Sequence, residues 1–372
     1  MRSLLTEQEK EEKAIKKLEL AIPYFRSAYI TFKAINADSF SDLKGLQGEF
    51  EKCYSNLSRI MKCDIDKSPS KEEILFLSSL KSKDSGTPTK VEMLKKLMIV
   101  TSKLSKFSSE LKDIEGLSQN LDSKLFNDVT FDIESCNYAA ESLIRNELSK
   151  PLPLKEKKEL FFTACTYSSY SIVAVILNHN PTFIAEKDQE GRTGLMHAAI
   201  VGSKEKCMYL VKKRADVKEI DNQGYTALHR SAHNGSASIC NLLIDAGADV
   251  NARPQKGYTP LNMAAISGNA DLGKALISFG ARLEPKMSFG EGTRVIARRY
   301  GNYNFIREIE GFNRSSVVEK EAVKSKITKK VAEEKQAFDM EEITPSTSIH
   351  DAASGEVNTR AGGGAGVGVG GL

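Results

Sequence analysis

Apolar residues recur every three or four positions through most of residues 1–150, which is the spacing of one face of an α-helix. This pattern predicts four amphipathic helices. Since short connections favour antiparallel neighbours, we expect an antiparallel helical bundle in this region. The four stripes are Ile15, Leu18, Ile22, Phe25, Tyr29 and Phe32; Leu43, Leu46, Phe50, Cys53, Leu57 and Ile60; Met93, Leu97, Val100, Leu104, Phe107, Leu111 and Ile114; and Phe126, Val129, Ile133, Cys136, Ala140 and Leu143.

The pattern leaves two interpretations of these apolar faces open. They can face one another inside a monomer, or they can form a coiled-coil seam for self-association or for docking a partner. No stripe extends much beyond about three heptads, so we favour the monomeric bundle. Homo-oligomerisation through residues 1–150 is the alternative.

From residue 188 to 301 the pattern changes to a repeat of 33 residues that runs through four frames without an insertion. Repeats of this length are typical of stacked helical units. The repeated positions are Asp188, Gly191, Thr193, Leu195, Ala199 and Gly202; Asp221, Gly224, Thr226, Leu228, Ala232 and Gly235; Gly257, Thr259, Leu261, Ala265 and Gly268; and, more faintly, Gly290, Ala297 and Gly301.

The first Gly of each unit permits a tight turn, and the Thr two positions later suits a helix N-cap. Gly247 and Gly280 suit the left-handed residue that ends the second helix of their units. Arg214 stands at this site in the unit before, where a left-handed non-glycine residue should cost on the order of 1 kcal/mol. No unit can bury its apolar face alone, so stacking must supply the stability.

The stretches GRTGLMHAA, GYTALHRSA and GYTPLNMAA resemble the signature of the ankyrin-repeat family, and AGADVNAR resembles the link between its units. The resemblance covers residues 154–312 and implies about five units: 154–187, 188–220, 221–253, 254–286 and a degenerate 287–312. The expected fold is all-α, with an ankyrin-repeat solenoid after the helical bundle. A charged, marginal helix at 315–342 and a disordered, finally Gly-rich tail at 343–372 should follow.

In ankyrin-like proteins, the resemblance implies a concave binding face made of the turn tips and the exposed positions of each first helix. The corresponding candidates for contact with a partner are Arg192, His197, Ile200, Asn222, Gln223, Tyr225, Arg230, His233, Lys256, Tyr258, Met263, Ile266, Arg299 and Tyr300. His229 should make structural hydrogen bonds. His197 and His233 should be surface residues without an acidic partner in the local pattern.

Tyr, Arg, His, Met and Ile dominate this set, and such types are common at protein interfaces. An exposed Tyr can equally be an ordinary turn residue. Residues 251–314 carry ten basic and five acidic side chains, which favours an acidic protein partner. The whole chain has a net charge of only +4 and no nucleic-acid recognition motif, which disfavours nucleic acid.

The spacing of Cys and Gly residues argues against a disulfide framework, a metal site and a nucleotide-binding loop. The six Cys residues form neither a CxxC pair nor a dense framework, so we expect reduced thiols and no metal. Cys207 and Cys240 share one repeat position and should be small packing residues. Residues 268–275, GNADLGKA, approach a nucleotide-binding loop, but Ala275 replaces its Ser or Thr and both Gly have repeat roles. We expect no cofactor.

Charged residues throughout the first thirty positions disfavour a secretion signal, and polar residues interrupt the uncharged stretch 160–185, which disfavours a membrane span. The expected location is the cytoplasm. The leading functional hypothesis is a non-catalytic adaptor. The alternatives are a host-directed effector of an intracellular microbe and, less favoured, an enzyme in residues 1–150, a segment without His or a nucleophile motif.

Overall fold

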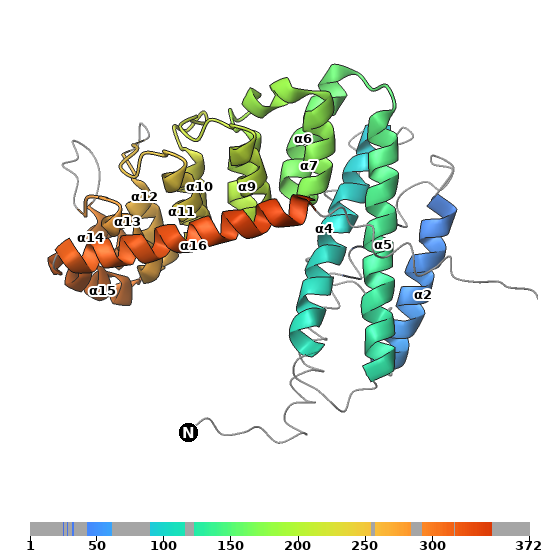
Figure 1. The fold of residues 1–372 in the computed structure, drawn as a ribbon, viewed down its shortest axis with the longest axis horizontal. Coiled ribbons are helices and arrows are strands. Elements are labelled where there is room, and N and C mark those ends of the chain that lie inside the picture. The colour runs from blue at the N-terminus through green and yellow to red at the C-terminus, as the bar shows by residue number, and fades with distance from the viewer. Residues whose placement is uncertain are drawn as a thin grey trace, which may run out of the picture. The chain divides into compact units, whose positions relative to one another are not determined.

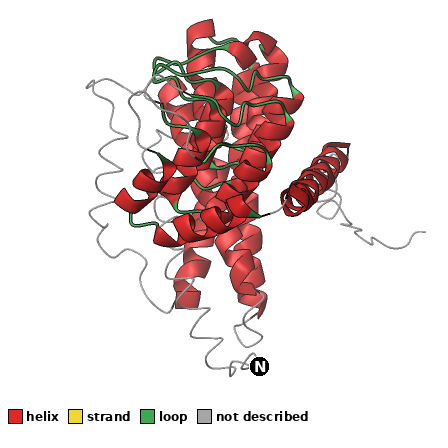
Figure 2. Cartoon of the chain, turned by 90° about the vertical axis from the view of Figure 1, so that its left-hand side faces the viewer, coloured by secondary structure: helices red, strands yellow, loops and turns green. Residues whose placement is uncertain are grey.

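The computed structural model describes residues 25, 28, 32, 43–61, 90–115, 123–253, 257–283, 292–315 and 317–343. These residues form helices joined by loops (Figure 2), and the one β-bridge among them joins Lys187 to Thr193. The predicted all-α class is therefore confirmed for this part of the chain. By its internal contacts the chain divides into two units, Met1–Thr328 and Lys329–Leu372.

Three long helices precede the repeats: α2 (Leu43–Met61), α4 (Lys90–Glu115) and α5 (Ser123–Ser149). Helix α5 packs against both α2 and α4 (Figure 1). Lys90 at the start of α4 lies 2.6 Å from Glu147 near the end of α5, so these two helices are antiparallel. The bundle over all of residues 1–150 stays a prediction, because 1–42 apart from three positions, 62–89 and 116–122 lie outside the described residues.

Residues of the predicted apolar stripes meet in the core of this region. Phe25 and Phe107 are fully buried, and their ring centroids lie 5.6 Å apart. Phe32 stacks on Phe50 at 4.7 Å. Burial is confirmed for every stripe member whose side chain is described: Phe25, Phe32, Leu46, Phe50, Cys53, Met93, Leu97, Val100, Leu104, Phe107, Ile133, Cys136, Ala140 and Leu143.

Pairs of shorter helices follow, and the first helix of each pair packs against the first helix of the next (Figure 1). They occupy the five expected units, whose boundaries remain a prediction. The pairs are α6 (Leu154–Tyr167) and α7 (Tyr170–His179), α8 (Gly194–Val201) and α9 (Lys204–Lys212), α10 (Ala227–His233) and α11 (Ala237–Asp245), α12 (Pro260–Ser267) and α13 (Ala270–Ser278), and α14 (Thr293–Arg299) and α15 (Tyr303–Arg314); the 3-10 helix η2 (Pro181–Ala185) follows α7.

The repeated glycines form copies of one bend. Gly191, Gly224 and Gly257 have φ values of 73°, 82° and 77°, in the left-handed region that side chains disfavour. The Thr two positions later caps the following helix: the Thr193 and Thr259 hydroxyls accept from the backbone N–H of the third helical residue, at 3.4 and 3.3 Å. The sequence prediction is confirmed at both turn and cap.

Small residues set the distance between neighbouring units, as predicted. Cys207 and Cys240 are fully buried, free thiols, and burial raises the pKa of Cys240 to about 12. At the equivalent position, Gly273 lies so close to α15 that a Cβ there would come within 2.4 Å of Ile309 Cδ1. Gly273 therefore serves helix packing, in line with our rejection of a nucleotide-binding loop.

The first repeat helix also contacts the N-terminal helices, since α6 packs against both α4 and α8. Lys95 of α4 pairs with Glu159 of α6 at 2.7 Å. On the other side of α6, Phe161 leaves no room for a side chain at Gly194, where a Cβ would lie 2.7 Å from its ring.

The uncharged stretch 160–185, which the sequence analysis weighed as a membrane span, is divided among α6, α7 and η2. None of the described helices combines the length and apolar character needed to cross a bilayer.

Helix α16 (Val317–Ile343) occupies the charged segment for which the sequence predicts a helix. Its marginal stability stays a prediction. Of the expected disordered tail, 343–372, Ile343 is the last residue of α16, and 344–372 lie outside the described residues.

Arg214 has a φ of 64° and is the one described non-glycine residue with a positive value. Gly247 and Gly280, its equivalents, both have φ of 94°. We expect Arg214→Gly to raise the melting temperature by about 2 °C, because it relieves on the order of 1 kcal/mol of backbone strain. Thermal unfolding followed by circular dichroism measures the change.

Lys213→Gly is the matched control, because Lys213 is the neighbouring residue but has an ordinary φ of −78°. Glycine there should lower the melting temperature through the added freedom of the unfolded chain. An Arg214→Gly protein that melts at or below the unsubstituted temperature would contradict the strain argument.

Candidate functional site

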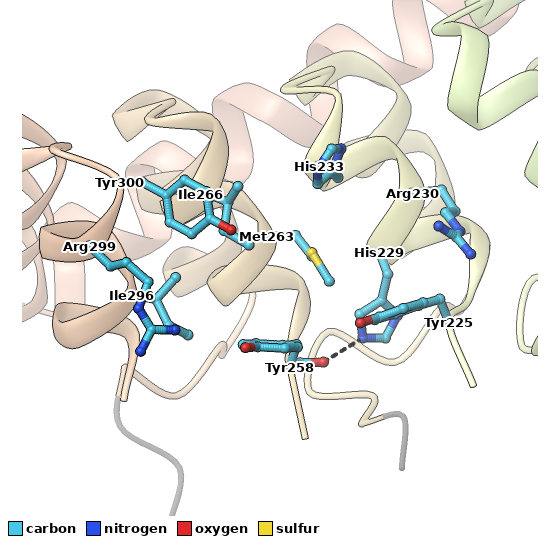
Figure 3. Close-up of a pocket in the computed structure, with 10 residues that line it drawn as sticks. All are labelled: Tyr225, His229, Arg230, His233, Tyr258, Met263, Ile266, Ile296, Arg299 and Tyr300. Atoms are coloured by element: carbon cyan, nitrogen blue, oxygen red, sulfur yellow. Dashed lines mark hydrogen bonds between the residues drawn. The ribbon is translucent and has the colours of Figure 1, made fainter. Parts of the chain in front are cut away.

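A hollow of about 280 Å³ lies over the first helices of three consecutive units, α10, α12 and α14 (Figure 3). Met263, Ile266 and Ile296 give it an apolar lining, and Met263 and Ile296 are buried. Figure 3 shows the rings of Tyr225 and Tyr258 along one edge. The full lining is Tyr225, His229, Arg230, His233, Tyr258, Met263, Ile266, Ile296, Arg299 and Tyr300.

Arg230 holds the turn that carries Tyr225 against helix α10. Its Nε donates to Asp221 Oδ2 at 3.1 Å, and one of its terminal nitrogens contacts the same oxygen. The guanidinium also lies 4.9 Å from the centroid of the Tyr225 ring. Asp221 Oδ1 in turn accepts the backbone N–H of Gln223 and Tyr225, each at 2.9 Å. Arg230 therefore positions one wall of the hollow, and Asp221 offsets much of its charge.

The preceding unit uses His197 in the same way. His197 Nε2 lies 2.8 Å from Asp188 Oδ2, and its Nδ1 lies 3.1 Å from the Thr166 hydroxyl. Its side chain is only 12% exposed, and this burial lowers the pKa of the imidazole although Asp188 opposes the shift. The expectation of an exposed His197 without an acidic partner is wrong. Local spacing missed the pair because the turn brings residues nine positions apart into contact.

The fourth unit, 254–286, carries neither residue of this tie between turn and helix. Pro254 replaces the turn Asp, and Met263 stands where the two earlier units have His197 and Arg230. Because Met263 offers no donor, its side chain remains available to line the hollow. The apolar part of the hollow therefore begins where the repeat departs from its ion-paired pattern.

His229 has the structural role that the sequence predicts. Its Nδ1 accepts the Thr226 backbone N–H at 3.2 Å, so the proton lies on Nε2, which is 3.1 Å from the carbonyl oxygens of both Ala252 and Tyr258. Burial lowers its pKa to about 4. A neutral His229 thereby links its own helix to the turn that carries Tyr258 (Figure 3).

Eight of the fourteen residues predicted from the sequence to contact a partner line the hollow. His229 and Ile296 also line it, although neither was among the fourteen. Ile296 follows Met263 by 33 residues, so the repeat register contained the signal for it. Of the remaining six, Lys256 lies outside the described residues and Ile200 is 36% exposed on α8. The other four do not line the hollow. Arg192 and His197 contact Asp188, Asn222 donates to the Gln189 carbonyl oxygen, and Gln223 accepts from Arg230, which does line it.

Sequence comparison identifies this architecture. The family model described as ankyrin repeats, in three copies, matches residues 160–254 and 195–287. This part of the chain consists of ankyrin repeats. No curated protein matched the chain in a separate comparison. The ankyrin repeats support a protein–protein interaction module in general terms. The hollow lies over the first helices of the third, fourth and fifth units, which are α10, α12 and α14.

The His229 hydrogen bonds predict a pH-dependent stability of the ankyrin repeats. Because burial lowers the His229 pKa from 6.5 to about 4, its contribution is complete above pH 6.5 and is lost as the pH falls through this window. At about pH 5 the loss should be roughly 2 kcal/mol. Urea unfolding at about pH 7.5 and about pH 5 measures it as a change in the free energy of unfolding.

His229→Gln is the control, because Gln keeps an amide donor but does not titrate in this range. It should be less stable near neutral pH, yet it should lose roughly 2 kcal/mol less than the unsubstituted protein on acidification. Contributions from all other groups are common to both proteins and cancel in the comparison. Equal losses in both would show that His229 is not held neutral.

Proposed function

We propose that the chain is a non-catalytic adaptor whose ankyrin repeats bind a protein partner in the hollow over α10, α12 and α14. The observation that carries this proposal is the combination of an apolar lining, from Met263, Ile266 and Ile296, with three tyrosines around it. Tyr rings bury a large area at a low entropic cost, and clusters of this kind form the centres of protein interfaces.

The size of the hollow favours a side chain as its occupant. Sites for small molecules span roughly 300–1,000 Å³, so about 280 Å³ lies at their lower limit. One bulky apolar residue of a partner fits this volume, with its backbone left among the tyrosine hydroxyl groups. The partner segment should therefore present a large apolar side chain.

The positive charge of helix α14 favours an acidic residue in the partner, next to its large apolar side chain. Helix α14 carries Arg294, Arg298 and Arg299 and no acidic residue, and Arg299 lines the hollow. An acidic residue of the partner near Arg299 would favour association and orientation more than affinity.

The N-terminal helices support a bracing role, since α4 packs against the first ankyrin helix α6. Self-association or a second partner through residues 1–150 remains part of the proposal. Buried, free cysteines such as Cys207 and Cys240 fit the reducing cytoplasm. No observation on the described residues favours delivery into a host cell or an enzyme in the N-terminal half.

Tyr300 and Tyr303 give a matched test of the hollow. Tyr300 is 55% exposed and lines the hollow, whereas Tyr303 is 67% exposed and does not. We expect Tyr300→Ala to weaken partner capture by about tenfold or more, because it removes an aromatic side chain from the interface. Quantitative mass spectrometry of affinity-purified complexes, compared among the unsubstituted protein, Tyr300→Ala and Tyr303→Ala, measures this.

Tyr303→Ala should leave capture unchanged. The proposal fails if Tyr300→Ala recovers the same proteins in the same amounts, or if both substitutions reduce capture alike. Circular dichroism on each variant confirms that the helices are retained.

A further inference from the structure

A second cavity, of about 440 Å³, lies where helices α4 and α5 meet the first two ankyrin units. It shares no residue with the hollow described above, and hydroxyl groups dominate its lining. The lining residues are Thr101, Ser102, Ser105, Lys106, Glu141, Thr166, Tyr167, Ser168, Ser169, Tyr170, Val201, Ser203, Glu205 and Lys206.

A buried lysine lines this cavity. Lys206 is 4% exposed, and its Nζ donates to the Thr166 carbonyl oxygen at 3.2 Å. Within the described part of the chain, no carboxylate lies within ion-pair distance of this ammonium group. Burial consequently lowers the pKa of Lys206. A buried ammonium group with one neutral acceptor is costly, and an anion beside it would offset the cost.

Ser168 supplies a second group without a partner. The residue is 6% exposed, and its hydroxyl oxygen makes no hydrogen bond to any described residue. An unsatisfied buried hydroxyl is rare in folded proteins and marks a place where a ligand or water belongs. It belongs to the same lining as Lys206.

Two helices also begin at this cavity. Ser169 is the N-cap of α7 and Ser203 that of α9, and neither side chain makes a capping hydrogen bond. Among the described residues, the first backbone N–H groups of both helices therefore have no intrahelical or side-chain acceptor. Helix N-termini carry a partial positive charge and bind phosphate groups through such N–H groups. The repeat places two of them side by side, because α7 and α9 are equivalent helices of adjacent units in contact.

The acidic residues of the lining are already engaged. Glu141 accepts from Arg145 at 3.3 Å and from the Ser171 hydroxyl at 3.1 Å. Glu205 accepts from the Ser203 hydroxyl at 3.4 Å. Lys106 and Lys206 balance the formal charge of these two carboxylates, so the two helix N-termini leave the cavity favourable to an anion.

We propose that this cavity binds a small molecule carrying a phosphate monoester, with the phosphate held by Lys206, Ser168 and the N-termini of α7 and α9. The cavity is larger than one phosphate, since a water molecule occupies about 30 Å³ and a phosphate only a few times that. Thr101, Ser102 and Ser105 of α4 offer hydroxyl groups to the remainder, which favours a hydroxylated molecule such as a sugar phosphate. The ligand would then bridge the N-terminal helices and the ankyrin repeats.

Isothermal titration calorimetry with inorganic phosphate, glucose 6-phosphate and glucose tests the proposal on the full chain. We expect glucose 6-phosphate to bind more tightly than inorganic phosphate, and glucose not to bind. Sedimentation with phosphatidic acid vesicles distinguishes a lipid headgroup as the source of the phosphate: Lys206-dependent pelleting would assign the site to lipid, and its absence to a free molecule. Binding of neither phosphate probe, with no pelleting, would overturn the proposal.

Lys206→Met is the diagnostic variant, because it keeps the length of the side chain and removes its charge. It should weaken phosphate binding by about tenfold or more, since charge-assisted hydrogen bonds are lost. Without ligand it should melt no lower than the unsubstituted protein, because no buried charge remains. Ser168→Ala should weaken binding less and leave the fold intact.

Lys212→Met, at an exposed position of the same helix, is the control and should bind normally. Equal affinity of Lys206→Met and Lys212→Met would overturn the site even if phosphate binds. The Tyr300→Ala protein should bind glucose 6-phosphate like the unsubstituted protein, so failure of this proposal and failure of the partner hollow are distinguishable.

Discussion

The dependence of each ankyrin unit on its neighbour is the constraint that governs this structure. A pair of helices only seven to fourteen residues long cannot bury its own apolar face, so its stability comes from stacking. Polar ties across the units fix that stacking. Asn302 donates to the carbonyl oxygens of Ala265 and Ile266 at 2.7 and 3.0 Å, and Asn269 donates to Gly235 at 2.9 Å. The Asn302 ties supply donors to carbonyls in the last turn of α12, whose orphan carbonyls need partners from outside the helix.

The same constraint explains why the hollow could be predicted in outline. The repeat register fixes which face each position occupies, so Met263 predicts a role for its equivalent, Ile296, and eight of the fourteen candidates lie around one cavity. The repeat register does not predict which side chains are held in hydrogen bonds or ion pairs. Asp221 and Arg230 are nine residues apart, and only the folded turn shows that the arginine is held by the carboxylate. His197 was misjudged for the same reason.

The N-terminal helices show the complementary limit. Apolar spacing found the buried faces of α2, α4 and α5, since Phe50, Leu104 and Ile133 are all fully buried. The apolar spacing did not predict the contact of α4 with α6. This contact joins a helix of the N-terminal amphipathic region to the first helix of the repeats, and neither pattern extends across that boundary. The polar cavity at this junction therefore could not be predicted from the sequence.

Departures from the repeat are informative because stacking leaves little freedom elsewhere. In two units an Asp ties the turn to the helix, through His197 or Arg230, and these ties favour a rigid turn. The fourth unit, 254–286, has Met263 at this position, and Met263 lines a surface hollow. Lys206 departs similarly, as a charge buried where an apolar residue would suit packing. A substitution that costs stability at an otherwise regular position needs another reason to be present, and the two proposed binding sites are such reasons.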